Sequence, residues 1–214
     1  ARTLLLIWLT TVSASLAAAP SGYSINSDSP TGNADSLYRI DLATGAETRI
    51  ATVKSQGQTR LDTEGLAYAP DGTLYGLDDD SLTLFALNPD NATVQAGSEF
   101  LIQGLPLGGG NDFGMTFACD GSLYLTSSAT GSLYRMDLTG KATRIGAQGS
   151  LNPVKISGLA AWGNPVQLYG LGNGADAEGN PETRNLYLID LANGTASLVG
   201  PLGGAAGPYL QGGL

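Results

Sequence analysis

SLYRIDLATG, residues 36–45, is the stretch that decides the fold, because variants of it recur along the chain. Residues 132–140 read SLYRMDLTG, residues 185–194 read NLYLIDLANG, and a looser copy, LTLFALNPD, occupies residues 82–90. Each copy alternates its side chains as a β-strand does and then ends in Asp or Asn ahead of a turn. The copies begin 46, 50 and 53 residues apart. A repeat of this length that consists of strands is typical of a β-propeller blade.

Four strands can be assigned to a complete repeat from the period-2 alternation and the turn residues. In the clearest repeat they are residues 65–69, 73–77, 82–87 and 92–96. We therefore predict an all-β fold, a β-propeller of four-stranded antiparallel blades. The expected blades cover about residues 20–54, 62–100, 112–149 and 155–202.

The first repeat lacks a first strand. Its second, third and fourth strands are predicted at residues 23–26, 36–42 and 48–53. Near the other end of the chain, QGGL at 211–214 is similar to the start of the missing strand. We therefore expect residues 208–214 to complete the first blade and close a ring of four blades, within one domain over 18–214. The alternative is that the chain is a fragment of a longer propeller.

Residues 1–17 are predicted to be a signal peptide. Arg2 supplies the positive charge, residues 4–9 the apolar stretch, and residues 14–19 the small side chains around a cleavage site after Ala17. A membrane anchor is the alternative, but the apolar stretch is shorter than the ~20 residues of a bilayer span. The prediction places the protein in the periplasm or outside the cell.

Composition limits the partners and the chemistry. The chain has 19 acidic and 10 basic residues, so its formal net charge is −9. Nucleic acids and anionic membranes attract Lys and Arg, and we expect neither as a partner after signal cleavage. Cys119 is the only cysteine, which we expect to be buried on a strand. The sequence has no His, which removes Ser-His-Asp and Cys-His catalysis.

Three carboxylates are candidate metal ligands. Glu64 and Asp112 stand just before the first strands of adjacent repeats, which would line the central channel, and Asp62 lies nearby in the sequence. Converging carboxylate oxygens favour a hard cation such as Ca²⁺. The alternative is that these acids accept hydrogen bonds from backbone amides where the strands start.

Trp162 and two loop acids are candidate ligand-binding residues. Trp162 falls at the end of a predicted inner strand, where the preceding two repeats have Ala. An indole at the rim of the channel could stack on a sugar or a peptide, or it could plug a wide centre. Asp176 and Glu178 lie in the long segment 173–184, and long loops often carry binding residues. A solvated loop is the alternative for these two acids.

EGLAYAPDGTLYGLDDDSLTLFALNP, residues 64–89, and its echoes at 112–138 and 156–191 resemble bacterial exported proteins of the NHL/YVTN-like β-propeller superfamily. The resemblance covers nearly all of the chain after the predicted signal peptide, and it implies the fold. The start Glu64-Gly65-Leu66 is also similar to that of Ca²⁺-dependent propeller hydrolases, the gluconolactonase- and phytase-like groups. That second resemblance would imply a metal in the channel.

Two functions of different class are therefore expected. The favoured one is a monomeric, non-catalytic module that needs no cofactor and binds an extracellular protein, peptide or glycan through one face and its long loops. The alternative is a Ca²⁺-dependent hydrolase of lactones, esters or phosphates that acts in the channel. The fold does not decide between them, because propellers serve both purposes.

Overall fold

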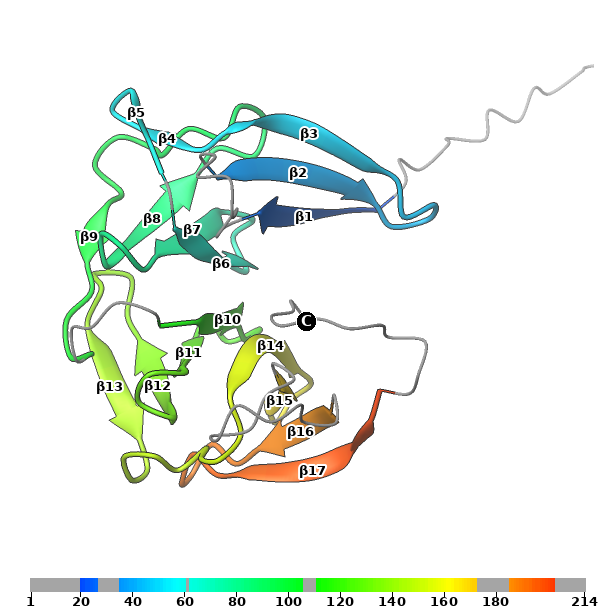
Figure 1. Cartoon of the computed structure of the whole chain (residues 1–214), viewed down its shortest axis with the longest axis vertical. Coiled ribbons are helices and arrows are strands. Elements are labelled where there is room, and N and C mark those ends of the chain that lie inside the picture. The colour runs from blue at the N-terminus through cyan, green and yellow to red at the C-terminus, as the bar shows by residue number, and fades with distance from the viewer. Residues whose placement is uncertain (1–19, 27–34, 61, 106–110, 173–184, 203–214) are drawn as a thin grey trace, which may run out of the picture.

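A computed structural model describes residues 20–26, 35–60, 62–105, 111–172 and 185–202. Four antiparallel sheets are arranged around a common axis as the blades of a four-bladed β-propeller (Figure 1). The prediction of an all-β propeller with four blades is confirmed. The described ranges contain no helix long and apolar enough to cross a membrane.

The blades follow one another along the chain. Blade 1 contains β1 (Ser21–Asn26), β2 (Ser36–Asp41) and β3 (Glu47–Thr52). Blade 2 contains β6 (Thr63–Tyr68), β7 (Leu74–Asp78), β8 (Thr83–Leu87) and β9 (Phe100–Leu101). Blade 3 contains β10 (Phe113–Phe117), β11 (Leu123–Ser127), β12 (Ser132–Met136) and β13 (Ala142–Ile145). Blade 4 contains β14 (Ile156–Trp162), β15 (Gln167–Gly172), β16 (Asn185–Ile189) and β17 (Ala196–Pro201). A short strand pair, β4 (Lys54–Ser55) with β5 (Gln58–Thr59), lies between blades 1 and 2 in the sequence.

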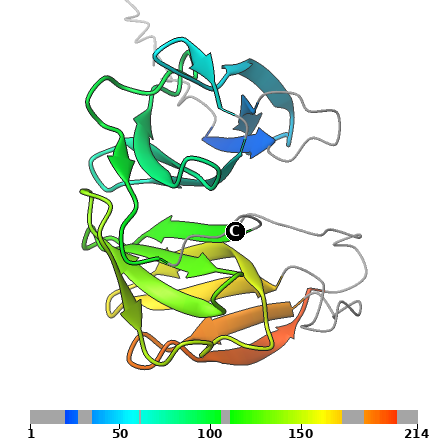
Figure 2. The same ribbon diagram turned by 60° about the vertical axis from the view of Figure 1, so that its left-hand side comes forward.

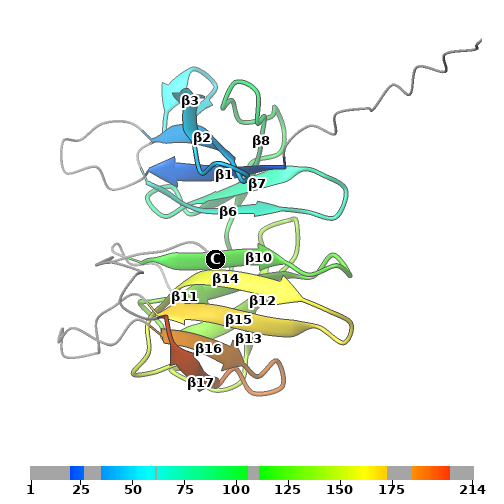
Figure 3. The ribbon, with the colours of Figure 1, turned by 90° about the vertical axis from the view of Figure 1, so that its right-hand side faces the viewer.

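The innermost strands of the four blades meet near the axis. β1 packs against β6, β6 against β10, and β10 against β14, and these strands run through the middle of the molecule (Figure 3). Figure 2 shows blades 1 and 2 as one half of the molecule and blades 3 and 4 as the other. The axis is therefore surrounded by one strand from each blade.

Blade 1 has three strands in the described part of the chain. Its middle strand, β2, carries SLYRID, and variants of this sequence form the third strands β12 (SLYRM) and β16 (NLYLI), so β1 corresponds to a second strand. The first blade thus lacks a first strand among the described residues, as predicted. Residues 208–214 and residues 1–17 lie outside the described residues, so ring closure by the former and the signal peptide in the latter stay predictions.

The fourth strand of blade 2 differs from the prediction. Residues 92–96 do not form it, because the chain turns sharply after β8: Ala92 has φ 57° and its amide donates to the carbonyl of Asn88 at 2.9 Å. A left-handed residue breaks the extended path of a strand, and only isolated bridges form at Thr93 and Val94. The fourth strand is instead β9, in which Leu101 pairs with Thr83.

Alternation within each third strand explains how the blades pack. Leu84 belongs to the apolar cluster between blades 2 and 3, whereas the next residue, Phe85, belongs to the cluster between blades 1 and 2. In blade 3, Leu133 faces the cluster shared with blade 4, and Tyr134 faces the cluster shared with blade 2. Successive side chains of a strand point to opposite faces, so one apolar strand supplies two interfaces.

Candidate functional site

Two adjoining cavities lie in the channel between the inner strands. The larger, about 540 Å³, lies where β6, β10 and β14 begin, and we call it the acidic cavity. The smaller, about 220 Å³, lies where those strands end, and we call it the aromatic cavity. Tyr23, Leu66, Met115 and Leu159 line both cavities. The two cavities thus share walls that come from all four blades.

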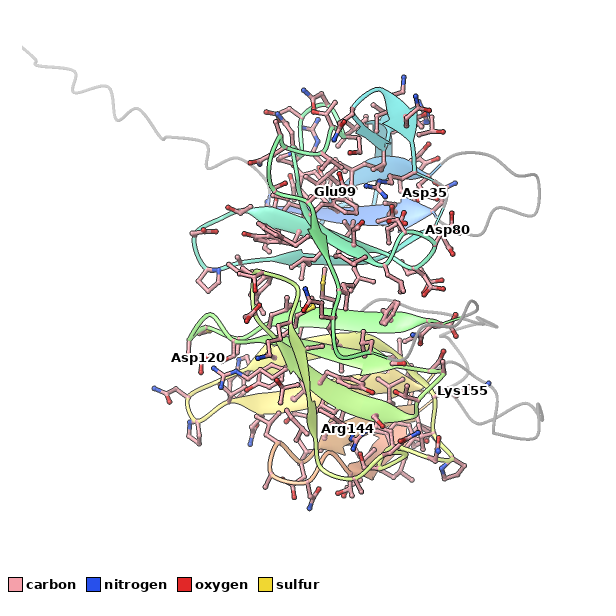
Figure 4. All side chains as sticks on the ribbon, turned by 90° about the vertical axis from the view of Figure 1, so that its left-hand side faces the viewer. Asp35, Asp80, Glu99, Asp120, Arg144 and Lys155 are labelled. Carbon is pink, nitrogen blue, oxygen red and sulfur yellow. The ribbon has the colours of Figure 1, made fainter. Side chains whose placement is uncertain are left out.

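Charged residues that are labelled in Figure 4 mark the two ends of the channel. Asp35, Asp80 and Lys155 lie at the end of the acidic cavity, and Asp120 lies at the opposite, aromatic end (Figure 4). β1 runs against the direction of the other inner strands, since its first residue, Ser21, lines the aromatic cavity.

The acidic cavity has largely apolar walls. Among its described lining residues, Glu64 is the only charged one, and Tyr23, Ser24 and Ser157 supply hydroxyls. The apolar side chains of the lining are Ile25, Ile40, Leu42, Leu66, Phe113, Met115 and Leu159. A concave apolar site with a few polar groups is the usual form of a small-molecule pocket.

β-bulges place Glu64 and Ser157 in this lining. The pairing of β6 with β7 shifts between Thr63 and Gly65, so Glu64 is the extra residue of a bulge. The pairing of β14 with β15 shifts in the same way around Ser157. A bulge bends the strand and redirects a side chain, and both extra residues line the acidic cavity.

The three predicted metal ligands do not meet at this cavity. β10 has no bulge, so Phe113, and not Asp112, is the lining residue that corresponds to Glu64. Oε2 of Glu64 accepts a hydrogen bond from the amide of Phe113 at 3.1 Å, which is the contact expected under the alternative interpretation of these acids. Neither Asp112 nor Asp62 lines the cavity. Among the described residues no group of three or more acidic or cysteine side chains is arranged to hold a metal, so the Ca²⁺ site stays a prediction.

Aromatic side chains gather at the other end of the channel. Tyr23, Tyr68 and Phe117 line the aromatic cavity. The ring centroids of Tyr23 and Tyr68 lie 5.8 Å apart in an edge-to-face arrangement, and those of Tyr75 and Phe117 lie 5.4 Å apart. Tyr68 is 44% exposed, so a ligand can reach its ring from solvent.

The environment keeps the phenol of Tyr68 protonated. Burial raises the pKa of Tyr68 to about 12, and its hydrogen bond with Tyr23 acts in the same direction. Burial also raises the pKa of Tyr75. An unperturbed phenol is already protonated at neutral pH, and these phenols stay hydrogen-bond donors to a still higher pH.

Two turns at this end carry ionised carboxylates. Hydrogen bonds from the backbone amide of Thr73 to Asp71 and from that of Ser122 to Asp120 lower the pKa of each acid. Cys119 lies in the second turn and is exposed. Its expected burial on a strand is wrong, because β10 ends at Phe117 and Cys119 lies within the turn that the amide of Gly121 closes by donating to the carbonyl of Ala118.

Trp162 ends β14 at the aromatic end of the channel, as predicted. It pairs with Gln167 across a tight turn in which Gly163 has φ 80°. The side chain is 70% exposed. An indole this exposed does not plug the centre of the channel, and it is available for stacking.

Asp176 and Glu178 lie outside the described residues. The strands that flank their segment end at Gly172 and begin at Asn185. β15 runs from Gln167, the partner of Trp162, to Gly172, the partner of Ile156, a length of roughly 17 Å at about 3.3 Å per residue. The attachment points of this segment are therefore at the opposite end of blade 4 from Trp162.

Tyr23, Tyr68 and Ser157 were not predicted as site residues. A signal for Tyr68 exists, because Tyr68 and Phe117 each stand three residues after the glycine of their inner strands, Gly65 and Gly114. No comparable signal marks Ser157, since a bulge cannot be read from alternation alone.

Comparison with known proteins gives a family and a fold. A family model described as a repeat of unknown function (DUF6923) matches residues 18–143. No curated protein sequence matches the chain. Among solved structures, a structural genomics protein of unknown function from Bacteroides thetaiotaomicron is 18% identical with a TM-score of 0.53, and the match covers 83% of this chain and 44% of that one.

Two further structures are similar. An auxiliary nutrient binding protein from Bacteroides ovatus is 12% identical with a TM-score of 0.54, over 89% of this chain and 46% of that one. Virginiamycin B lyase from Staphylococcus aureus is 15% identical with a TM-score of 0.49, over 86% of this chain and 57% of that one. The chain thus spans about half the length of these structures, and identities this low show a shared fold alone. Since the family model matches more than half of the chain, the protein belongs to the DUF6923 repeat family.

Proposed function

We propose that this protein is an exported, monomeric, non-catalytic module that binds a glycan at the aromatic end of its channel. One observation carries the proposal: every blade delivers an aromatic ring to that end. The rings are those of Tyr23, Tyr68, Phe117 and Trp162, from blades 1, 2, 3 and 4.

The chemistry of this end suits a sugar. The C–H face of a pyranose ring packs on an aromatic face, and Tyr and Trp combine a large apolar surface with a hydrogen-bonding group. Trp162 and Tyr68 are the exposed rings. Asp71 and Asp120, in the adjoining turns, carry ionised carboxylates that can accept hydrogen bonds from sugar hydroxyls.

The same features favour binding over hydrolysis. Glycoside hydrolysis generally uses two carboxyl groups about 5–9.5 Å apart on either side of the bond. The two acids at the aromatic end, Asp71 and Asp120, both have lowered pKa values, whereas the general acid of such a pair has a raised pKa. Glu64 belongs to the acidic cavity, and its carboxylate accepts a hydrogen bond from the backbone of blade 3. The similar structure from Bacteroides ovatus is named as a nutrient binding protein, which agrees with a binding role for this fold.

Tryptophan fluorescence tests the proposal directly. The chain has two tryptophans, Trp8 and Trp162. Trp8 lies in the predicted signal peptide, so in protein produced from residue 18 onward the emission reports on Trp162 alone. We expect a saturable change in emission with at least one of maltohexaose, xylohexaose and cellohexaose. In calorimetry, Trp162→Ala should weaken that binding roughly tenfold, since aromatic contacts contribute about 0.5–1.5 kcal/mol beyond the area they bury.

A matched control is Leu198→Ala, which truncates a side chain that is 62% exposed on the outer strand β17. Its affinity for the sugar should stay unchanged. Undiminished sugar binding by Trp162→Ala would refute the site. Binding of peptides but of no oligosaccharide would mean that the ligand is a peptide and not a glycan.

A further inference from the structure

We infer that the acidic cavity is a second ligand site, which takes a small molecule with an apolar body and a single ammonium group. This inference goes beyond the glycan proposal, because it concerns the other end of the channel and a different chemistry. It rests on three features of the cavity, namely its size, its apolar walls and the position of one carboxylate.

Size and walls set the kind of ligand. A volume of about 540 Å³ lies within the ~300–1,000 Å³ typical of small-molecule sites. Apolar side chains from all four blades line it, among them Ile25 and Ile40 of blade 1, Leu66 of blade 2, Met115 of blade 3 and Leu159 of blade 4. An alkyl or aryl body would be enclosed on several sides and removed from water.

The charge of the lining selects the head group. Among the described residues of the lining, Glu64 alone is charged, and its carboxylate attracts a cationic head and repels an anionic one. The hydrogen bond from the amide of Phe113 fixes one carboxylate oxygen of Glu64 at 3.1 Å and so orients the group. The carboxylate is specific to β6, since the equivalent bulge of β14 carries Ser157 and β10, which has no bulge, carries a phenylalanine at the corresponding place.

Two hydroxyls of the same lining offer acceptors for an ammonium group. Ser157 reaches the lining through the equivalent bulge of β14, and Ser24 reaches it from β1. A primary ammonium has three N–H donors and no acceptor. One carboxylate and two hydroxyls, from three different blades, supply acceptors of the right kind and number.

NMR of methionine methyl groups gives a local test on the full chain. The chain has two methionines. Met115 lines both cavities of the channel, whereas Met136 lines neither and serves as an internal control. Glu64 lines the acidic cavity alone, so its replacement assigns a Met115 shift to that end. With the methyl carbons labelled, the signal of Met115 is identified by its loss in Met115→Leu. The probes are hexylamine, hexanol and hexanoate at pH 7, which share an apolar body and differ in head group.

We expect hexylamine to shift the Met115 signal saturably and to leave that of Met136 in place. Hexanol should bind about 10- to 100-fold more weakly, since its hydroxyl can donate to Glu64 but carries no positive charge, and hexanoate should give no shift. Glu64→Gln retains an oxygen that can accept from Phe113, so its affinity for hexylamine should fall to that for hexanol. Glu47→Gln, which removes an exposed charge on β3, should bind hexylamine as the original chain does.

Several results would overturn the inference. Equal responses to hexylamine and hexanoate would show that Glu64 does not select the ligand. A shift with CaCl₂ and none with hexylamine would assign the cavity to a metal. If hexylamine binds only after residues 208–214 are deleted, that segment and not a ligand occupies the cavity in the intact protein. None of these results bears on sugar binding at Trp162, which Glu64→Gln should leave unchanged.

Discussion

Replacing Arg60 with methionine is expected to lower the free energy of unfolding by about 3–5 kcal/mol, the usual effect of removing one partner of a buried ion pair. The guanidinium of Arg60 lies 3.6 Å from Asp78, whose side chain is 2% exposed, and it also forms an ion pair with Glu99. Arg60 donates to the hydroxyl of Ser81 at 2.6 Å, and it lies over the ring of Phe85 at 5.4 Å. Methionine would keep much of the packing and leave Asp78 without its cation.

Urea denaturation followed by circular dichroism measures this effect. Arg60→Lys should lose less stability than Arg60→Met, because it keeps the positive charge and gives up the planar fork of donors. Adding Asp78→Asn to Arg60→Met should recover part of the loss, since the orphaned charge is then gone. If Arg60→Met unfolds at the urea concentration of the original chain, the ion pair does not stabilise the contact region between blades 1 and 2.

Gly114→Ala is expected to cost about 3 kcal/mol, at the upper end of the range for overpacking a core. A Cβ at this position would lie 2.6 Å from Oγ1 of Thr126 and 3.0 Å from Cγ of Leu159. That hydroxyl is buried, accepts from the amide of Gly114 at 3.1 Å and donates to the carbonyl of Ile156 at 2.8 Å. To make room, Thr126 would have to give up a bond that ties blade 3 to blade 4.

Gly200→Ala is the matched control, because a Cβ there meets nothing within 4 Å. Its stability should stay within about 0.5 kcal/mol of the original, as for most surface changes. Thermal unfolding of the two variants side by side separates a steric effect at the channel from a general effect of replacing glycine. Equal melting temperatures for the two would mean that the inner strands do not approach as closely as described.

The blades could be predicted from the sequence because the alternation in SLYRID is a local property. It assigns Leu133 and Tyr134 to opposite faces, and the structure places them in two different clusters between blades. The position of Trp162 at the end of an inner strand followed from the same pattern.

The composition of the site could not be predicted, because it depends on register. A shift of one residue moves a side chain to the other face of a strand. The bulge in β6 and its absence from β10 make Phe113 the counterpart of Glu64, although the sequence suggested Asp112. Topology also separated residues that were predicted to act together. Strand β15 begins beside Trp162 and ends where the segment 173–184 starts, so its whole length lies between them.

Hydrogen–deuterium exchange with mass spectrometry tests most directly the central claim, that ligands bind at the aromatic end of the channel. The full chain would be compared alone and saturated with whichever of the three oligosaccharides binds best. We predict slower exchange in peptides covering residues 21–24, 67–74 and 160–168, which carry Tyr23, Tyr68 and Trp162, and no change in β13. Slower exchange confined to β13 or other outer strands, with these three regions unaffected, would contradict the claim.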